Sequence, residues 1–212
     1  MSSAERRKQE REELRRLILD TAQELLATDG YEKVSMRRIA EKVNYSPTAL
    51  YLYFKDRGEM MDALAAEAFA LLADTLESIQ GGDPAERLRR IGHAYVEFAL
   101  ANRPVYALML QTSASPQDRY GEHATRRTHT LRAFGILADT VRQIAGSGDA
   151  EFAEGSDSVT VAATVFWAHI HGAVALVLGG HSRVFAGMEA QVCRQAVETA
   201  VAGLLAELPR KS

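Results

Sequence analysis

The segment between Ser35 and Lys55 constrains the fold of this chain most, because it predicts two short helices joined by a tight turn. Ser35 can cap the first helix, and Asn44 can end it, since asparagine tolerates left-handed backbone geometry. Ser46 and Pro47 then suit the start of the second helix, because serine caps free amides and proline fits the first turn.

The second short helix predicts a contact surface. It should end near Phe54, and Leu50 and Phe54, four residues apart, can anchor it to its neighbour. The side chains between them then point outward or sideways: Thr48, Ala49, Tyr51, Leu52 and Tyr53. Tyrosine hydroxyls donate to phosphates, small side chains allow close approach to base edges, and a helix start directs amides at phosphates. The segment therefore indicates DNA binding.

Hydrophobic residues recur at helical spacing through the rest of the chain, which predicts an all-α protein of about nine helices. The first helix should end at Gly30 and the fourth should run from about Asp56 to Ile79. The later helices should start near these residues: Pro84, Pro104, Thr130, Asp157 and Gly187. Loops are expected at 113–116 and 146–156. We expect a DNA-binding domain over residues 1–56 and a ligand-binding and dimerisation domain over residues 57–212.

The charge and cysteine content limit the cellular setting. The net charge of −3 does not suit a wholly basic nucleic-acid binder, so any basic surface must be local. The single cysteine, Cys193, excludes an intramolecular disulfide, and the charged N-terminus shows no secretory signal, so we expect a cytoplasmic protein. The run from Val159 to Leu178 carries no charged residue and is long enough to cross a bilayer. Its two histidines favour a buried interface helix, and no membrane partner is expected.

The residues from Ser35 to Lys55 resemble the TetR (tetracycline repressor) family of transcriptional regulators. Its hallmark is Thr/Ser-x-Arg-x-Ile-Ala, a turn, and then Ser-x-x-x-Leu-Tyr-x-x-Phe-Lys. Here it reads Ser35-Met36-Arg37-Arg38-Ile39-Ala40 and Ser46-Pro47-Thr48-Ala49-Leu50-Tyr51-Leu52-Tyr53-Phe54-Lys55. The Gly30-Tyr31 pair after the first helix also matches. This composite pattern covers the first quarter to third of the chain, and it implies a helix-turn-helix that binds a palindromic operator in double-stranded DNA.

The resemblance also implies roles by position. The phosphate-binding residues would be Ser35, Tyr51, Tyr53 and Lys55, with Ser46 at the cap. The residues nearest the bases would be Arg37, Tyr45, Pro47, Thr48, Ala49 and Leu52. Three positions depart from the usual family sequence: Asn44 replaces a glycine, Tyr45 a small aliphatic residue and Tyr53 a histidine. Tyr45 either extends the contact surface or packs, and Tyr53 keeps a hydrogen-bond donor.

The C-terminal part is expected to hold an effector pocket and a dimer interface, again by resemblance. Trp167, His171 and Gly172 resemble the Trp-x-x-x-His-Gly signature of one TetR subgroup. The ligand-binding candidates are Tyr95, Phe98, Tyr106, Met109, Phe134, Trp167 and His171, each of which could equally be core. The aromatic character suggests an apolar or aromatic effector, and no cofactor is implied. The all-round apolar run and a last-helix seam indicate a four-helix homodimer interface. That seam comprises Cys193, Ala196, Val197, Ala200 and Leu204.

Several alternatives remain open. The basic residues from Arg6 to Arg16 either form a frayed, solvated helix end or contact DNA. Residues 180–184 nearly spell a hydrolase nucleophile elbow but follow a helix and lack the closing glycine, so catalysis is not expected. His169 and His171 point apart on a helix and should not bind one metal ion. The expected function is a repressor released by a small-molecule effector; an activator or a helical protein-interaction module are the alternatives.

Overall fold

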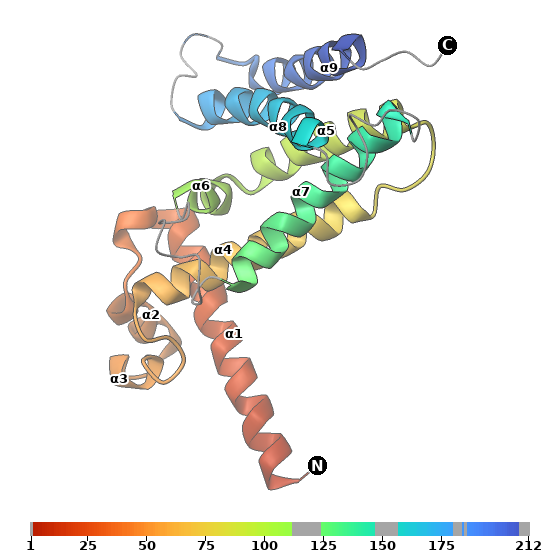
Figure 1. Cartoon of the computed structure of the whole chain (residues 1–212). Coiled ribbons are helices and arrows are strands. Elements are labelled where there is room, and N and C mark those ends of the chain that lie inside the picture. The colour runs from red at the N-terminus through yellow and green to blue at the C-terminus, as the bar shows by residue number, and fades with distance from the viewer. Residues whose placement is uncertain (1, 112–123, 147–156, 180–183, 185, 208–212) are drawn as a thin grey trace. The chain divides into compact units, whose positions relative to one another are not determined.

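The computed structural model describes residues 2–111, 124–146, 157–179, 184 and 186–207, and these residues are all-α, as predicted (Figure 1). They form nine α-helices, one short 3-10 helix at Tyr31–Lys33, and no strand. The α-helices are α1 (Ser3–Asp29), α2 (Met36–Val43), α3 (Pro47–Leu50), α4 (Arg57–Glu77), α5 (Pro84–Ala101), α6 (Arg103–Gln111), α7 (Ala124–Ala145), α8 (Asp157–Leu178) and α9 (Glu189–Glu207). The predicted loop at 113–116 lies outside the described residues, as does that at 146–156 except for Gly146.

The chain packs as two compact units. The first comprises Met1–Ala68 and Pro104–Arg127, and the second comprises Phe69–Arg103 and Thr128–Ser212. Helix α4 begins in the first unit and ends in the second. The sequence analysis divided the chain by function, into a DNA-binding domain over residues 1–56 and a ligand-binding and dimerisation domain over residues 57–212. That functional division stays a prediction.

The start and end signals read from the sequence determine the local geometry of the first unit. Gly30 ends α1 with a φ of 83°, a conformation that glycine adopts without strain. The Ser35 hydroxyl accepts from the Arg38 amide, 3.3 Å away, and caps α2. Asn44 takes left-handed geometry, with φ 59° and ψ 41°, and ends α2. Ser46 caps α3, as predicted.

Helix α3 is shorter than predicted, because its α-helical part ends at Leu50 and not near Phe54. The Tyr53 amide donates to the Leu50 carbonyl at 2.9 Å, and the Leu52 amide donates to the Ala49 carbonyl at 3.2 Å. Such i to i+3 hydrogen bonds tighten the last turn. Phe54 follows this turn and is buried, and its amide donates to the Leu50 carbonyl at 3.1 Å.

Arg57, the first residue of α4, fastens that helix to the segment before α2. Its guanidinium donates to the Val34 carbonyl at 2.7 Å and to the Tyr31 carbonyl at 2.6 Å. The same group lies 4.1 Å from the centroid of the Tyr31 ring, a cation–π geometry. The beginning of α4 is therefore part of the first unit's framework.

The second unit has a close crossing of α5, α8 and α9. Gly92 of α5 leaves no room for a side chain, because a Cβ atom there would lie 2.7 Å from a Val197 methyl and 3.2 Å from the Phe166 ring. The α9 seam predicted for the dimer interface takes part in this core: Cys193, Val197, Ala200 and Leu204 are buried within the chain. The prediction that this seam faces a partner was therefore wrong, since intrachain packing on α5 and α8 already covers it.

Helix α8 is apolar on both faces, as predicted. Its buried face includes Phe166, Ile170 and Val174, and its opposite face exposes Val161, Val165 and Leu176. Ser158–Leu178 is long and apolar enough to cross a membrane, by length and composition only, and 28% of its 18-residue apolar window is buried inside the protein. The outward face of α8 is an apolar surface without a partner in the described part of the chain.

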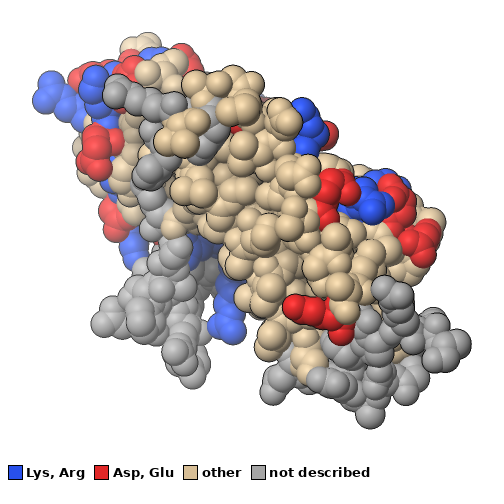
Figure 2. Space-filling view, turned by 90° about the horizontal axis from the view of Figure 1, so that it is seen from above, with Lys and Arg blue, Asp and Glu red and all other residues tan. Residues whose placement is uncertain are grey.

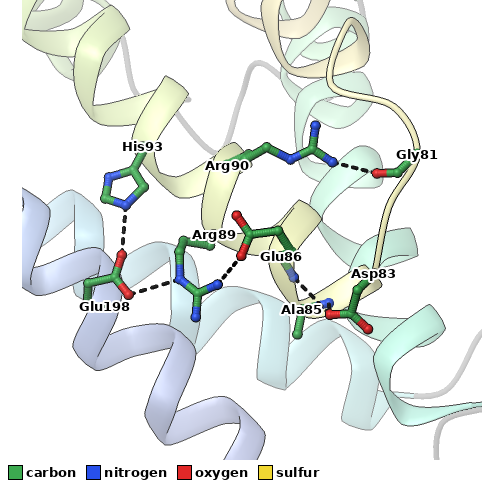
Figure 3. A network of polar contacts seen from close by, with 8 residues as sticks. All are labelled: Gly81, Asp83, Ala85, Glu86, Arg89, Arg90, His93 and Glu198. Atoms are coloured by element: carbon green, nitrogen blue, oxygen red, sulfur yellow. Dashed lines mark hydrogen bonds and ion pairs between the residues drawn. The ribbon is translucent and has the colours of Figure 1, made fainter.

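A polar network joins α5 to α9 beside this core (Figure 3). The Glu198 carboxylate of α9 accepts from Nε2 of His93 at 2.8 Å and from Nε of Arg89 at 3.0 Å. Arg89 also pairs with Glu86 in the first turn of α5, where the Asp83 carboxylate caps the helix. The network therefore fixes the side-by-side register of α5 and α9.

We expect Glu198→Gln to lower the thermal midpoint by a few degrees near neutral pH. The hydrogen bond from His93, followed by that from Arg89, holds the pKa of Glu198 below its ordinary value of 4.5. A carboxyl whose folded pKa is depressed stabilises the fold above its unfolded pKa, and this stability is lost as the pH falls through the folded pKa. The difference between the two proteins should shrink in acid, as measured by calorimetry from pH 7 to pH 3.5. Glu207→Gln, on the exposed end of α9, is the control. A difference independent of pH would contradict the ionic role.

Candidate DNA-binding and effector-binding sites

Helix α3 and its following turn present side chains to solvent while two anchors hold them in place. Leu50 and Phe54 are buried against the rest of the first unit. Between and before these anchors, Thr48, Tyr51 and Leu52 are exposed, with Leu52 exposed by 73%. The arrangement is a short helix that is fixed on one side and open on the other, as an inserted helix requires.

The other residues predicted to bind DNA surround this helix. Pro47, Ser46, Tyr45 and Lys55 are exposed, whereas Ala49, Tyr53 and Ser35 are half-buried. Arg37 is exposed on α2, where its Nε donates to Glu41 at 3.0 Å. The Ser35 and Ser46 hydroxyls are already engaged as helix caps, so any phosphate contact by them would be additional. The assignment of individual residues to bases or phosphates stays a prediction.

Helix α1 also reaches the turn after α3. Arg11 donates from Nη2 to the Leu52 carbonyl at 3.3 Å, and its guanidinium lies 5.8 Å from the Tyr53 ring centroid. Arg15 lies 5.1 Å from the Phe54 ring centroid. The sequence marked these arginines only as part of a basic segment. Their contacts with residues about 40 positions away could not be derived from helical spacing.

Three of the predicted effector-binding residues meet in the second unit. Nε1 of Trp167 donates to the Tyr95 hydroxyl oxygen at 3.2 Å, and that oxygen lies 3.0 Å from Nδ1 of His171. The Trp167 and His171 rings, four residues apart on α8, have centroids 5.1 Å apart. Tyr95 is buried, His171 is half-buried, and Trp167 is 39% exposed. The cluster therefore combines aromatic surface with a chain of hydrogen bonds.

The protonation of this cluster follows from its surroundings. Burial lowers the pKa of His171 below its ordinary value of 6.5, so the imidazole is neutral at neutral pH. Because the Tyr95 oxygen already accepts from Trp167, its own proton can be donated to Nδ1 of His171. In that arrangement the imidazole proton would be on Nε2. The cluster is thus polar but uncharged.

The remaining effector candidates are more dispersed. Phe98 is buried three residues along α5 from Tyr95, and Phe134 is half-buried on α7. Tyr106 and Met109 are buried in α6, which belongs to the first unit. The structure therefore brings together Tyr95, Trp167 and His171, and the membership of the other four in one site stays a prediction.

The alternative chemistries have little support in the described residues. No group of three or more histidine, cysteine, aspartate or glutamate side chains there could hold a metal ion. Burial raises the pKa of the Cys193 thiol above its ordinary value of 9.0, which disfavours the reactive thiolate. Residues 180–183 of the hydrolase-like stretch lie outside the described part of the chain.

Helices α8 and α9 expose a broad uncharged face, seen in the middle of Figure 2. On α8 the exposed residues of this face are Val161, Val165 and Ala168, at spacings of four and three, and Leu176 two turns further on. On α9 the exposed positions opposite the buried seam are Gln195, Thr199, Ala202 and Ala206. Apolar and small side chains in this pattern are typical of a helix face that packs against another helix.

Both parts of the sequence match models of one protein family. Residues 18–64 match the model for bacterial regulatory proteins of the tetR family, and residues 88–202 match a tetracyclin repressor-like C-terminal domain. The tetracycline repressor protein class C of Escherichia coli is 30% identical over 183 residues, which cover 78% of this chain and 82% of that protein.

Solved structures show the same fold. A protein from Rhodococcus sp. RHA1 is 28% identical with a TM-score of 0.73, covering 91% of this chain and 95% of that one. A transcriptional regulator from Saccharomonospora viridis in complex with choline is 24% identical, with a TM-score of 0.64, and the match covers 90% and 96% of the two chains. The chain described here therefore belongs to the TetR family of helix-turn-helix transcriptional regulators.

Proposed function

We propose that the protein is a cytoplasmic homodimer that represses transcription by binding a palindromic operator and leaves it when a small-molecule effector binds. The observation that carries the proposal is the geometry of α3, in which Leu50 and Phe54 are buried while Thr48 and Tyr51 are exposed. Two such helices in a dimer would enter successive major grooves about 34–36 Å apart. Repression is preferred to activation because the related Escherichia coli protein is named a repressor.

The homodimer is supported by the uncharged face of α8 and α9. In a twofold dimer the same surface of each subunit packs against its copy, so two helices from each chain would form a four-helix interface. This role replaces the predicted α9 seam, which is buried inside the chain, with the exposed side of the same helix.

The effector is proposed to bind beside Tyr95, Trp167 and His171. The ring contact between Trp167 and His171 supports the proposed membership of the Trp-x-x-x-His-Gly subgroup. The aromatic rings favour a ligand with an apolar or aromatic body, and the uncharged imidazole gives no ionic attraction to it. Choline binding by the Saccharomonospora viridis regulator makes a quaternary ammonium a second ligand class to test, since aromatic faces attract such cations. An effector can release the operator only if it binds the DNA-free state more tightly.

The DNA-binding role is tested on operator fragments selected from genomic DNA by the purified protein. Lys55→Ala should lower the salt dependence of binding by about one unit of log–log slope, because it removes one phosphate contact. Tyr51→Phe should weaken binding roughly 2- to 12-fold, the usual net value of one hydrogen bond. Lys42→Gln is the control, since Lys42 pairs with Glu24 of α1 at 2.8 Å. Unchanged binding in both test variants would contradict the phosphate roles.

Trp167 provides a direct test of the effector site, because it is the only tryptophan in the chain. We expect any effector that releases the operator to change the fluorescence of the wild-type protein. Trp167→Ala should respond at least about tenfold more weakly to that effector and keep its operator affinity without effector. A panel that includes choline and aromatic acids supplies the ligands. Release of DNA with unchanged emission, and with an unchanged response in Trp167→Ala, would remove Trp167 from the site.

A further inference from the structure

The first helix carries a row of three arginines that differ from the other basic residues around them. Arg7, Arg11 and Arg15 are spaced four residues apart, so they share one face of α1, and all three are exposed. The helix is ordered from its first turn, because the Ser2 hydroxyl accepts from the Glu5 amide and the Glu5 carboxylate accepts from the Ser2 amide. This capping box favours a formed helix end over a frayed one.

Three neighbouring cations on α1 each lie within 4 Å of a carboxylate of the same helix. Arg6 lies 3.7 Å from Glu10, Lys8 lies 3.9 Å from Glu12, and Arg16 lies 3.1 Å from Asp20. Each of these pairs sets one positive charge beside one negative charge. The net charge of this segment does not distinguish cations that lie beside a carboxylate from cations that do not.

The three arginines of the row have no carboxylate partner among the described residues. Arg7 donates to the carbonyl and the hydroxyl of Ser3, at 3.2 and 3.1 Å. Arg11 contacts the Leu52 carbonyl, and Arg15 contacts the Phe54 ring, as described above. Their positive charge is consequently uncompensated, and the row begins at the turn that follows α3.

The row extends away from α3 in regular steps. Four residues of α-helix rise about 6 Å, so Arg7 lies one such step beyond Arg11, which itself touches the turn after α3. That distance is comparable to the spacing of phosphates along one DNA strand and lies within the Debye length of about 10 Å at 0.1 M salt. Arg11 therefore lies beside the turn that follows the helix predicted to enter DNA, and Arg7 lies one step further along α1.

We propose that Arg7 and Arg11 bind backbone phosphates that flank the groove entered by α3, and that Arg15 positions α1 by its contact with Phe54. This inference rests on the proposed operator binding. Phosphate contacts fix the register of a protein on the duplex and add affinity without reading sequence. The operator footprint should therefore extend beyond the bases that α3 reads.

The test compares Arg7→Gln with Arg6→Gln on the same selected operator, from 50 to 300 mM salt. Both variants lose one positive charge from the same turn of α1, but only Arg7 lacks a carboxylate partner in the described structure. Arg7→Gln should reduce the log–log salt slope by about one and weaken binding roughly tenfold at 0.1 M salt. Arg6→Gln should stay within twofold of wild type. Circular dichroism confirms that both variants remain equally folded.

Each outcome has a distinct meaning. Specific binding by wild type, together with Arg7→Gln and Arg6→Gln that behave alike, would overturn the phosphate role of Arg7. A loss that depends on the flanking base sequence, with an unchanged salt slope, would also overturn it and point to base contacts in the minor groove. Absence of specific binding by the wild-type protein would instead refute the proposed function. The expected slope change in Arg7→Gln alone supports the inference.

Discussion

Val165→Glu is expected to convert the dimer to monomers. Val165 lies on the outward face of α8 and is 59% exposed in the single chain, so the change should not unfold a monomer. In a twofold interface the substitution appears twice, and each unpaired carboxylate would lose its water. Burial of unpaired charge costs several kcal/mol per ion, so the dimer dissociation constant should rise by more than roughly 1000-fold.

The loss of the dimer should also remove most operator affinity. Two linked heads bind a palindrome with an effective concentration in the millimolar range, so separation weakens binding on the order of 100- to 10,000-fold. Sedimentation velocity and operator titration measure the two effects. Leu131→Glu on α7 is the matched control, because Leu131 is 58% exposed and lies outside α8 and α9. A Val165→Glu protein that remains dimeric at micromolar concentration would place the interface elsewhere, as would monomers of the control.

Leu50→Ala is expected to unfold the DNA-binding part of the chain selectively. Leu50 is fully buried, and truncation of a buried leucine costs about 2–5 kcal/mol. Trp167 lies in the second unit. The unfolding transition reported by its fluorescence should therefore occur at a higher urea concentration than the first loss of helix seen by circular dichroism. The ratio of folded to unfolded first unit should fall by a factor of roughly 30 or more, and operator binding should weaken under conditions where that unit is no longer mostly folded.

Leu52→Ala is the matched variant two residues further along. Its side chain is mostly exposed, so stability should change by less than about 0.5 kcal/mol while operator affinity still falls. Urea titrations followed by both probes separate the two variants. Wild-type stability in Leu50→Ala would show that α3 is not anchored through this residue. Unchanged operator affinity in Leu52→Ala would remove Leu52 from the DNA contact.

Local signals explain why the first unit could be predicted so fully from the sequence. Gly30, Ser35, Asn44 and Ser46 determine where helices begin and end through their own backbone preferences and caps, and the structure confirms all four. The early end of α3 was not predicted, because the spacing of Leu50 and Phe54, both of which are buried, is also that of a regular helix. Spacing alone would have allowed a regular helix through that position.

Long-range packing explains what the sequence left open in the second unit. The spacing of Trp167 and His171 predicted a shared face, but their hydrogen-bonded partner Tyr95 lies more than 70 residues earlier. The α9 seam was assigned to the wrong partner because an apolar stripe does not say whether its own chain or a second chain covers it. The contact between Glu198 and His93 had no sequence signal beyond the polarity of its members.

The anchoring of Arg57 has a mechanical consequence. Its guanidinium holds the carbonyls of Tyr31 and Val34, immediately before the residue that caps α2. These hydrogen bonds tie the first turn of α4 to the segment that leads into the helix-turn-helix. If an effector reorients the first turn of α4, the segment before α2 should move with it. Any bending of α4 would then have to occur beyond its first turn.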